Sequence, residues 1–156
     1  AESKARSLFD QLRNAGISAA VLADDSGIEV AALGGRPGVL SARYAGIDAT
    51  WPARREKLLE EIASVPAGQR AAKFCCAMML ILDNGESFTG YGEVEGLVTG
   101  EEIGRFGFGY DPIFWYPPAN KTFAELDEEA KNRVSHRRRA ADALLSALRA
   151  SRTGSG

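Results

Sequence analysis

The stretch VLADDSG, residues 21–27, is a short apolar run that ends in two carboxylates, a hydroxyl and a glycine. In open α/β sheets, ligands collect where strands end at their carboxyl side, so acids placed there can meet a metal or a phosphate. The same residues also make an ordinary turn, because Asp and Ser bond their own backbone and Gly supplies positive φ. The pattern predicts a strand over residues 19–23 that leads into an acidic turn, with a structural and a functional interpretation open for that turn.

The loop that follows this turn favours the functional interpretation. It carries glycines at positions 34, 35, 38 and 46, and Arg36 and Arg43 lie among them. A glycine-rich backbone can approach a ligand closely, and guanidinium groups can bind an anion. The loop therefore has the residue types of an anion-binding segment.

Length and composition predict one domain over residues 1–150, followed by a disordered tail over residues 151–156. The chain has 156 residues, of which 45% are apolar, with a net charge of −2 and a pI near 5.5. This acidic balance argues against a protein that coats nucleic acid or an anionic membrane. We therefore expect neither nucleic acid nor a membrane as a partner.

The two cysteines, Cys75 and Cys76, are neighbours inside an apolar run, so we expect free thiols and a cytoplasmic location. No secretory signal or membrane-spanning run is visible in the sequence. The chain has one histidine, which makes a zinc site of the usual His and Cys ligands improbable. Any metal should be a hard cation bound by oxygen.

Apolar periodicity predicts helices over residues 1–14, from about residue 50 to 65, and from residue 136. A central strand over residues 71–82 should turn at Asp83-Asn84-Gly85 and return over residues 87–98 as a hairpin. Glycines 90, 92 and 96 should weaken the returning strand, and Glu93 and Glu95 should face solvent. The second helix should be capped by Asp48 or Thr50 and should expose its charged residues, which are Arg54, Arg55, Glu56, Lys57, Glu60 and Glu61. The last helix should turn inward Ala141, Leu144, Leu145 and Leu148.

The stretch GFGYDP, residues 107–112, predicts an irregular loop before a strand, because its glycines oppose a helix and its proline interrupts ladder bonding. Phe108 and Tyr110 in such a loop could pack the core. They could equally offer a flat surface to a nucleobase, with Asp111 as a hydrogen-bond acceptor beside it. Both interpretations stay open on the residues alone.

A basic segment begins near Lys131, and Ser135 is a plausible N-cap of the last helix. His136 and Arg137 would then lie in the first helical turn, where backbone N–H groups and the helix dipole favour a bound oxygen. The alternative is a solvated face or a weak nucleic-acid patch formed by the neighbouring arginines.

Taken together, these segments resemble one family, the inosine/xanthosine triphosphate pyrophosphatases. The stretches that carry the resemblance are ADDSG at 23–27 with LGG at 33–35 and PG at 37–38, SARY at 41–44, GFGYDP at 107–112, and Lys131 with SHR at 135–137. They cover most of the chain in the order in which the family has them, so the resemblance is specific.

The resemblance implies an α/β fold, with an elongated, twisted mixed sheet, flanking helices in two lobes and a nucleotide cleft between the lobes. It also implies Mg²⁺-dependent cleavage of a purine nucleoside triphosphate to the monophosphate and pyrophosphate, by a homodimer. By the same resemblance, Asp25 is the metal-linked general base. The implied substrate contacts are Ser26, Phe108, Gly109, Tyr110, Asp111, Lys131, His136 and Arg137.

Members of the family begin with a strand and a phosphate-binding loop, and they carry a metal-binding glutamate in a Glu-Asn-Ala segment. Ala1 matches the alanine of that segment, with Lys4 following as the pattern expects. We therefore expect this chain to lack the N-terminal strand, the phosphate loop and that glutamate. This departure keeps a second hypothesis open, a purine-nucleotide-binding protein of the same fold without catalysis.

The base itself offers a means of selection. Hypoxanthine and xanthine present an O6 acceptor and an N1–H donor, whereas adenine shows the opposite pattern. His136 or Arg137 donating to O6, with an acceptor such as Asp111 near N1, would mismatch adenine at both atoms. Stacking on Tyr110 or Phe108 would add about 1–3 kcal/mol for any base without choosing between them.

Overall fold

The computed structural model describes residues 1–153, which form two compact units. The first unit contains Ala1–Asp25, Cys76–Glu93 and the chain from His136 onward, and the second contains Ser26–Cys75 and Val94–Ser135. The α-helices are α1 (Glu2–Asn14), α2 (Trp51–Glu61), α3 (Glu128–Val134) and α4 (His136–Thr153). The strands are β1 (Val21–Val30), β2 (Ala71–Ile81), β3 (Ser87–Val98), β4 (Phe114–Tyr116) and β5 (Lys121–Thr122).

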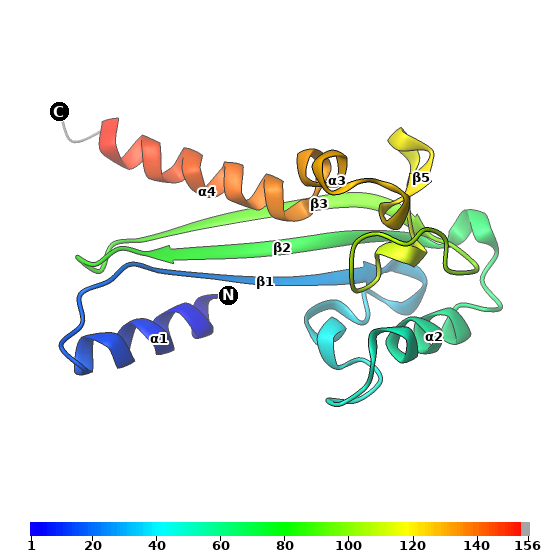
Figure 1. Ribbon diagram of the computed structural model, residues 1–156, viewed down its shortest axis with the longest axis horizontal. Coiled ribbons are helices and arrows are strands. Elements are labelled where there is room, and N and C mark those ends of the chain that lie inside the picture. Colours follow the sequence, from blue (N-terminus) through cyan, green and yellow to red (C-terminus); the bar gives the residue numbers. More distant parts are fainter. Residues whose placement is uncertain (154–156) are drawn as a thin grey trace. The chain divides into compact units, whose positions relative to one another are not determined.

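These strands form one sheet in the order β1-β2-β3-β4-β5 (Figure 1). The arrows of β1, β2 and β3 alternate in direction, and β4 is antiparallel to both β3 and β5. Leu97 lies opposite Trp115, which in turn lies opposite Thr122. The α/β fold with a twisted sheet and flanking helices is confirmed, and the strand order follows the order of the chain.

The predicted hairpin between β2 and β3 is present. The Leu82 N–H donates to the Glu86 carbonyl at 2.8 Å, and Gly85 takes a φ of +91° at the turn. A residue with a side chain rarely adopts that φ, so the glycine in the Asp-Asn-Gly turn has a defined purpose.

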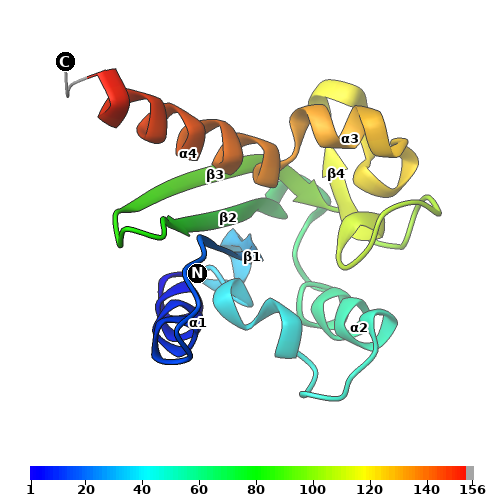
Figure 2. The ribbon, with the colours of Figure 1, turned by 60° about the vertical axis from the view of Figure 1, so that its left-hand side comes forward.

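In the first unit, α1 and α4 pack in different ways, α1 through buried side chains and α4 through close contact of its backbone with β3. Ala5 and Phe9 of α1 pack with Val21, Met79 and Ile81. Helix α4 instead lies very close to β3, as seen also in the turned view of Figure 2.

Gly90 and Gly92 make that close approach possible. A Cβ on Gly90 would lie 2.1 Å from the Ala140 carbonyl oxygen, and one on Gly92 would lie 2.4 Å from the His136 carbonyl oxygen. These glycines, which the sequence marked only as weak points of a strand, therefore act as the contact surface for α4.

The second unit has an aromatic core. Phe74, Phe114 and Phe123 meet with ring centroids 4.4 to 5.8 Å apart. Leu58 of α2 and Ile62, which directly follows the helix, are fully buried in the same cluster. Thr50 caps α2 by accepting from the Ala53 N–H, which agrees with the predicted cap.

The predicted acidic turn was wrong, because residues 24–27 lie inside β1 in extended conformation. A Cβ on Gly27 would lie 2.2 Å from the Gly38 carbonyl oxygen, and Ser41 Oγ accepts the Ile28 N–H at 2.9 Å. Gly27 is therefore needed for a close backbone approach and not for a positive φ. The loop glycines at 34, 35, 38 and 46 do take positive φ, as expected of an irregular glycine-rich segment.

Two further predictions about exposure were wrong. Arg54 and Arg55 are buried, because both find partners in other segments of the second unit. Leu145 is 45% exposed while its neighbour Leu144 is buried, since only one of two consecutive helical residues can face β3. Helix α4 continues through residues 151–153, so the predicted tail does not begin at Ser151, and residues 154–156 lie outside the described residues.

Of the two glutamates predicted to face solvent, Glu95 is exposed and Glu93 is half-buried. The Glu93 carbonyl accepts a hydrogen bond from Arg139 Nη1 at 2.9 Å, which ties this part of β3 to α4.

Candidate functional site

Two adjacent carboxylates stand in the middle of β1, and each is paired with a different cation. Asp25 Oδ1 accepts from Lys4 Nζ at 3.0 Å, whereas Asp24 Oδ2 lies 3.4 Å from Arg137 Nε. Neighbouring residues of an extended strand point to opposite faces, which is why the two acids have separate partners. The Asp25 side chain is 39% exposed, so its charge is balanced without being removed from water.

The start of α4 brings Arg137 to Asp24 within the first unit. His136 and Arg137 occupy the first helical turn, as predicted, and Arg137 Nη1 lies 3.3 Å from His136 Nε2. His136 is 2% exposed, while the Arg137 side chain remains partly open to solvent. We call Lys4, Asp24, Asp25, His136 and Arg137 the acid–base cluster.

The sequence alone did not indicate that Lys4 belongs to this cluster. No local pattern links Lys4 to an acid 21 positions away. Only the packing of α1 beside β1 creates the pair, through the buried residues Ala5 and Phe9.

In the second unit, Asp111 organises the aromatic loop. It is 2% exposed, and its Oδ2 accepts from the Phe108 N–H at 2.7 Å and also from Lys131 Nζ. A Cβ on Gly107 would lie 2.2 Å from the same oxygen, so this position requires glycine. We call Gly107–Asp111 with Lys131 the aromatic-loop cluster.

The two aromatic side chains of this loop have different environments. Phe108 is 56% exposed, and Lys131 Nζ lies 4.5 Å from its ring centroid. Tyr110 is 3% exposed, donates its hydroxyl to the Ser41 carbonyl at 2.9 Å and meets Trp51 edge to face. Phe108 is therefore the ring available for stacking, and Tyr110 anchors the loop to the core.

Burial also changes the acidity of two tyrosines of the second unit. It raises the pKa of Tyr110 well above the ordinary value of a phenol. Burial, helped by the hydrogen bond that Tyr44 donates to Glu61, raises the pKa of Tyr44 to about 12. Both hydroxyls are therefore neutral donors at physiological pH.

Arg55 of α2 is a further residue of this loop's environment that the sequence did not reveal. Its Nη1 donates to the Gly109 carbonyl at 2.8 Å. Its Nε and Nη2 donate to the two carboxylate oxygens of Glu102 at 2.7 and 2.9 Å. In the sequence Arg55 is one charge in a run of charges, and nothing local distinguishes it from its exposed neighbours.

Ser26, the remaining predicted contact, belongs to the second unit. Its Oγ is buried and has no hydrogen-bond partner among residues 1–153. A buried hydroxyl without a partner is costly, so this atom is a candidate to bind a ligand oxygen. The structure thus groups Asp25, His136 and Arg137 in one unit and Ser26, residues 108–111 and Lys131 in the other.

The donor set for a metal consists of separated carboxylates. Within the described part of the chain, no three His, Cys, Asp or Glu side chains gather as a metal-binding group. Mg²⁺ is commonly held by only one or two carboxylates together with water and substrate phosphates. The single half-exposed carboxylate of Asp25 fits that mode of binding, and it does not fit a site made of protein ligands alone.

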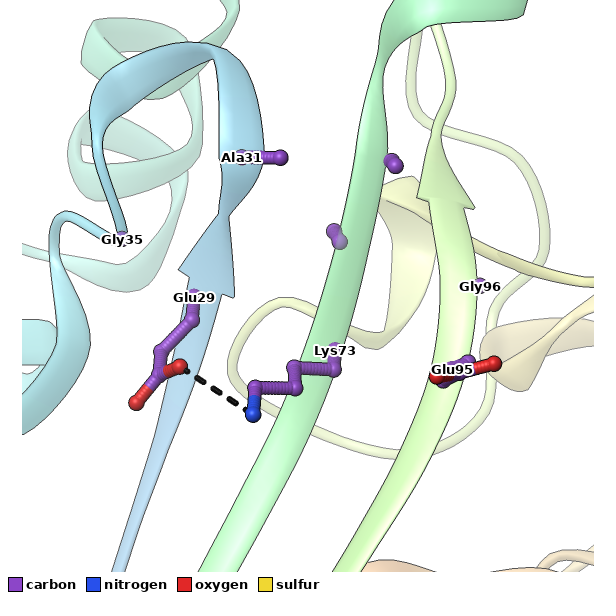
Figure 3. Close-up of a pocket in the computed structure, with 8 residues that line it drawn as sticks. Glu29, Ala31, Gly35, Lys73, Glu95 and Gly96 are labelled. Atoms are coloured by element: carbon purple, nitrogen blue, oxygen red, sulfur yellow. Dashed lines mark ion pairs between the residues drawn. The ribbon is translucent and has the colours of Figure 1, made fainter.

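A pocket of about 480 Å³ lies on the sheet of the second unit, away from the side chains predicted from the sequence (Figure 3). Glu29, Lys73 and Glu95 stand on three neighbouring strands, and Lys73 Nζ lies 3.6 Å from Glu29 Oε2. The rest of its lining is small, namely Ala31, Gly35, Ala71, Ala72 and Gly96. This pocket contains none of the predicted site residues.

Two other features bear on the kind of protein this is. Cys75 and Cys76 are not joined in a disulfide, as predicted. Across residues 1–153, every helix is too short or too polar to span a lipid bilayer.

Comparison with known proteins places these features in context. The model of the Ham1 family matches residues 1–147. The dITP/XTP pyrophosphatase of Syntrophobacter fumaroxidans is 53% identical over 119 residues, which cover 76% of this chain and 50% of the relative. That of Bacillus subtilis is 48% identical over 124 residues, 80% of this chain and 61% of the relative. The chain therefore spans less than two thirds of the length of these relatives.

Solved structures that resemble this chain also include proteins of this kind. The Ham1 protein of Staphylococcus aureus superposes with a TM-score of 0.80 at 40% identity, covering 87% of this chain and 70% of that one. A second solved structure is the nucleoside-triphosphatase / dITP/XTP pyrophosphatase of Mycobacterium abscessus. It superposes with a TM-score of 0.73 at 41% identity, covering 91% of this chain and 72% of that one.

Proposed function

Because the chain belongs to the Ham1 family, we propose that it is a nucleoside triphosphate pyrophosphatase that converts ITP, dITP and XTP to the monophosphate and pyrophosphate. Its relatives from Syntrophobacter fumaroxidans and Bacillus subtilis bear the name dITP/XTP pyrophosphatase. The observation that carries the proposal is Asp25, a half-exposed carboxylate whose Oδ1 lies 3.0 Å from Lys4 Nζ. Such a group can accept a proton at neutral pH.

Asp25 is the proposed general base and the proposed ligand of Mg²⁺. Cleavage between the α- and β-phosphates needs a water nucleophile that loses a proton as it attacks, and a leaving pyrophosphate in line with it. When bound, Mg²⁺ would neutralise charge on the phosphoryl oxygens. Lys4 beside Asp25 and Arg137 beside Asp24 supply cations of the chain itself for the same negative charge.

The aromatic-loop cluster is the proposed binding segment for the base. Phe108 offers the exposed ring, and its backbone is held by Asp111. Because Asp111 is buried and already accepts from Lys131, we assign it to holding the loop and Lys131 to the substrate side. His136 or Arg137 is the proposed donor to O6, which adenine cannot accept, and Ser26 Oγ is a further proposed contact.

The experiment that tests this function is pyrophosphate release from ITP and ATP by the unmodified chain and by Asp25→Asn. We expect ITP to be strongly preferred and Asp25→Asn to lose at least about 10²-fold in kcat, because the variant cannot take the proton. Asp24→Asn is the matched control and should lose less, since its partner is Arg137. Equal turnover of both bases, or an unchanged Asp25→Asn, would refute the assigned roles.

A second candidate, a nucleotide-binding protein without catalysis, is favoured by one observation. Ser26 Oγ, which is buried and has no hydrogen-bond partner among the described residues, could bind a nucleotide oxygen without any part in hydrolysis. Calorimetry that shows ITP binding without pyrophosphate release would establish this alternative. We also propose that the protein is cytoplasmic, which the absence of a disulfide between Cys75 and Cys76 supports. We further propose that it is a homodimer, which the family resemblance supports.

A further inference from the structure

Arg55 and Glu102 connect helix α2 to the aromatic loop inside the second unit. The Arg55 side chain is 10% exposed and uses three of its nitrogens, two on the Glu102 carboxylate and one on the Gly109 carbonyl. Two parallel donors on one carboxylate fix the plane of the guanidinium, which leaves Nη1 aimed at a single point. That point is the carbonyl of Gly109, the residue that follows Phe108.

The segment around Phe108 needs such an anchor. Gly107 and Gly109 take φ values of +74° and +65°, and residues without a side chain lose more backbone entropy on ordering than others. On one side of Phe108, Asp111 fixes the N–H at 2.7 Å. On the other side, Arg55 fixes the Gly109 carbonyl at 2.8 Å. The exposed ring is thus held by its backbone from both directions.

We propose that Arg55, oriented by Glu102, is a positioning residue that sets the conformation of the base-binding loop and thereby its selectivity. This inference rests on the proposed function, because it needs Phe108 and its neighbours to receive the base. Arg55 does not touch the substrate in this account. It acts through the Gly109 peptide, so its loss should weaken recognition of the base and spare the attack on phosphorus.

The test compares Arg55→Lys and Arg55→Met with the unmodified full chain, using kcat and KM for ITP and for ATP. Lysine keeps the charge but cannot make the fork to Glu102 and the bond to Gly109 together. We expect both variants to raise KM for ITP about tenfold, to change kcat less than about twofold, and to lower the ITP-to-ATP ratio of kcat/KM about tenfold.

Glu102→Gln is the milder variant, because it leaves Arg55 in place and removes only the charge that orients it. We expect a smaller change of the same kind, with KM and selectivity moving together. Glu101→Gln is the matched control, since Glu101 is an exposed neighbour whose backbone carbonyl accepts a hydrogen bond from Thr99 Oγ1. It should equal the unmodified chain. If the Arg55 variants do not fold, Glu102→Gln decides by itself.

The possible outcomes separate the two claims. A chain that neither binds ITP in calorimetry nor releases pyrophosphate from it overturns the proposed function. A chain that binds ITP, with Arg55→Lys and Glu102→Gln matching Glu101→Gln in KM, in Kd and in selectivity, overturns the positioning role alone. A fall in kcat with unchanged KM and selectivity would also overturn it, because a purely structural loss removes active molecules without altering recognition.

Discussion

At the scale of single residues, burial decides which charged side chains matter to this structure. Asp111 and Lys131 form an ion pair with side-chain exposures of 4% and 11%, whereas Arg133 and Glu129 form one on the surface of α3 with 70% and 79%. Breaking a buried pair leaves an uncompensated charge in a poorly solvated place. The two pairs are therefore expected to differ greatly in their effect on stability.

Lys131→Met tests this difference. We expect it to lower the free energy of unfolding by about 3–5 kcal/mol, because the Asp111 carboxylate remains buried without its cation. The double variant Asp111→Asn with Lys131→Met should recover part of the loss. Urea unfolding measures both. Arg133→Met should cost at most about 1 kcal/mol, and an equal loss in Lys131→Met and Arg133→Met would contradict the argument.

Tyr44 gives a prediction about pH. Its pKa is about 12 in the folded chain, against 10.0 for an ordinary phenol, because burial and the bond to Glu61 favour the neutral form. Between these values the unfolded chain loses the Tyr44 proton first, so stability falls as pH rises through this window. Tyr44→Phe should be less stable than the unmodified chain near neutral pH, and the gap should narrow from about pH 10 upward.

Urea unfolding of both proteins over this pH range measures the gap directly. Lysines and other groups titrate equally in the two chains, so the difference isolates Tyr44. A gap that stays constant up to about pH 12 would show that the phenol has no raised pKa.

At the scale of elements, the contact of α4 with β3 depends on glycines at positions where a residue with a side chain would not fit. A Cβ on Gly92 would lie 2.3 Å from the Ala140 amide nitrogen and 2.4 Å from the His136 carbonyl oxygen. These are backbone atoms of a helix, which cannot move aside singly. The position of His136 and Arg137 therefore depends on a residue in another element.

Gly92→Ala should destabilise the chain by about 1–3 kcal/mol or more, because α4 must shift away from β3. The shift would also displace His136 and Arg137, so turnover of ITP should fall with it. Gly68→Ala is the control, since a Cβ there would meet nothing within 4 Å, and it should stay within about 0.5 kcal/mol. Thermal unfolding and ITP turnover check both variants, and a Gly92→Ala protein as stable as Gly68→Ala would be incompatible with this packing.

At the scale of the whole molecule, the proposed metal should link binding to stability. The described residues provide Asp25 without a closed set of protein ligands, so Mg²⁺ should bind mainly together with a triphosphate. Neither Mg²⁺ alone nor ITP in a chelator should then stabilise the fold strongly.

The expected result is that ITP and Mg²⁺ together raise the melting temperature more than the sum of their separate effects. At 100 times the dissociation constant, a ligand adds about 2.7 kcal/mol. Differential scanning calorimetry would measure these shifts with a binding-competent, non-hydrolysed analogue of ITP. Chelation should also abolish pyrophosphate release, and activity that survives the chelator would exclude the metal.

Local signals in the sequence predicted α1, α2 and α4, the β2–β3 hairpin and the irregular aromatic loop, because each rests on spacing within a few residues, whereas the short helix α3 was not predicted. The interpretation of residues 24–27 failed for the opposite reason. Asp-Asp-Ser-Gly has the composition of a turn, yet Gly27 is extended because Gly38, eleven positions away, packs on its backbone. The partners of Arg55 and Lys4 were hidden in the same way, since both lie far along the chain.

The sequence by itself determined α1, α2, α4 and the β2–β3 hairpin, because hydrophobic period, caps and glycine positions are properties of neighbouring residues. Only the tertiary structure decided which acid pairs with which cation, which aromatic ring is exposed and which arginine is buried. These pairings and exposures depend on contacts between distant segments. Their free energies come from burial, which a linear sequence pattern does not reveal. The side chain of Phe108 is exposed and that of Tyr110 is buried because of such contacts between distant segments.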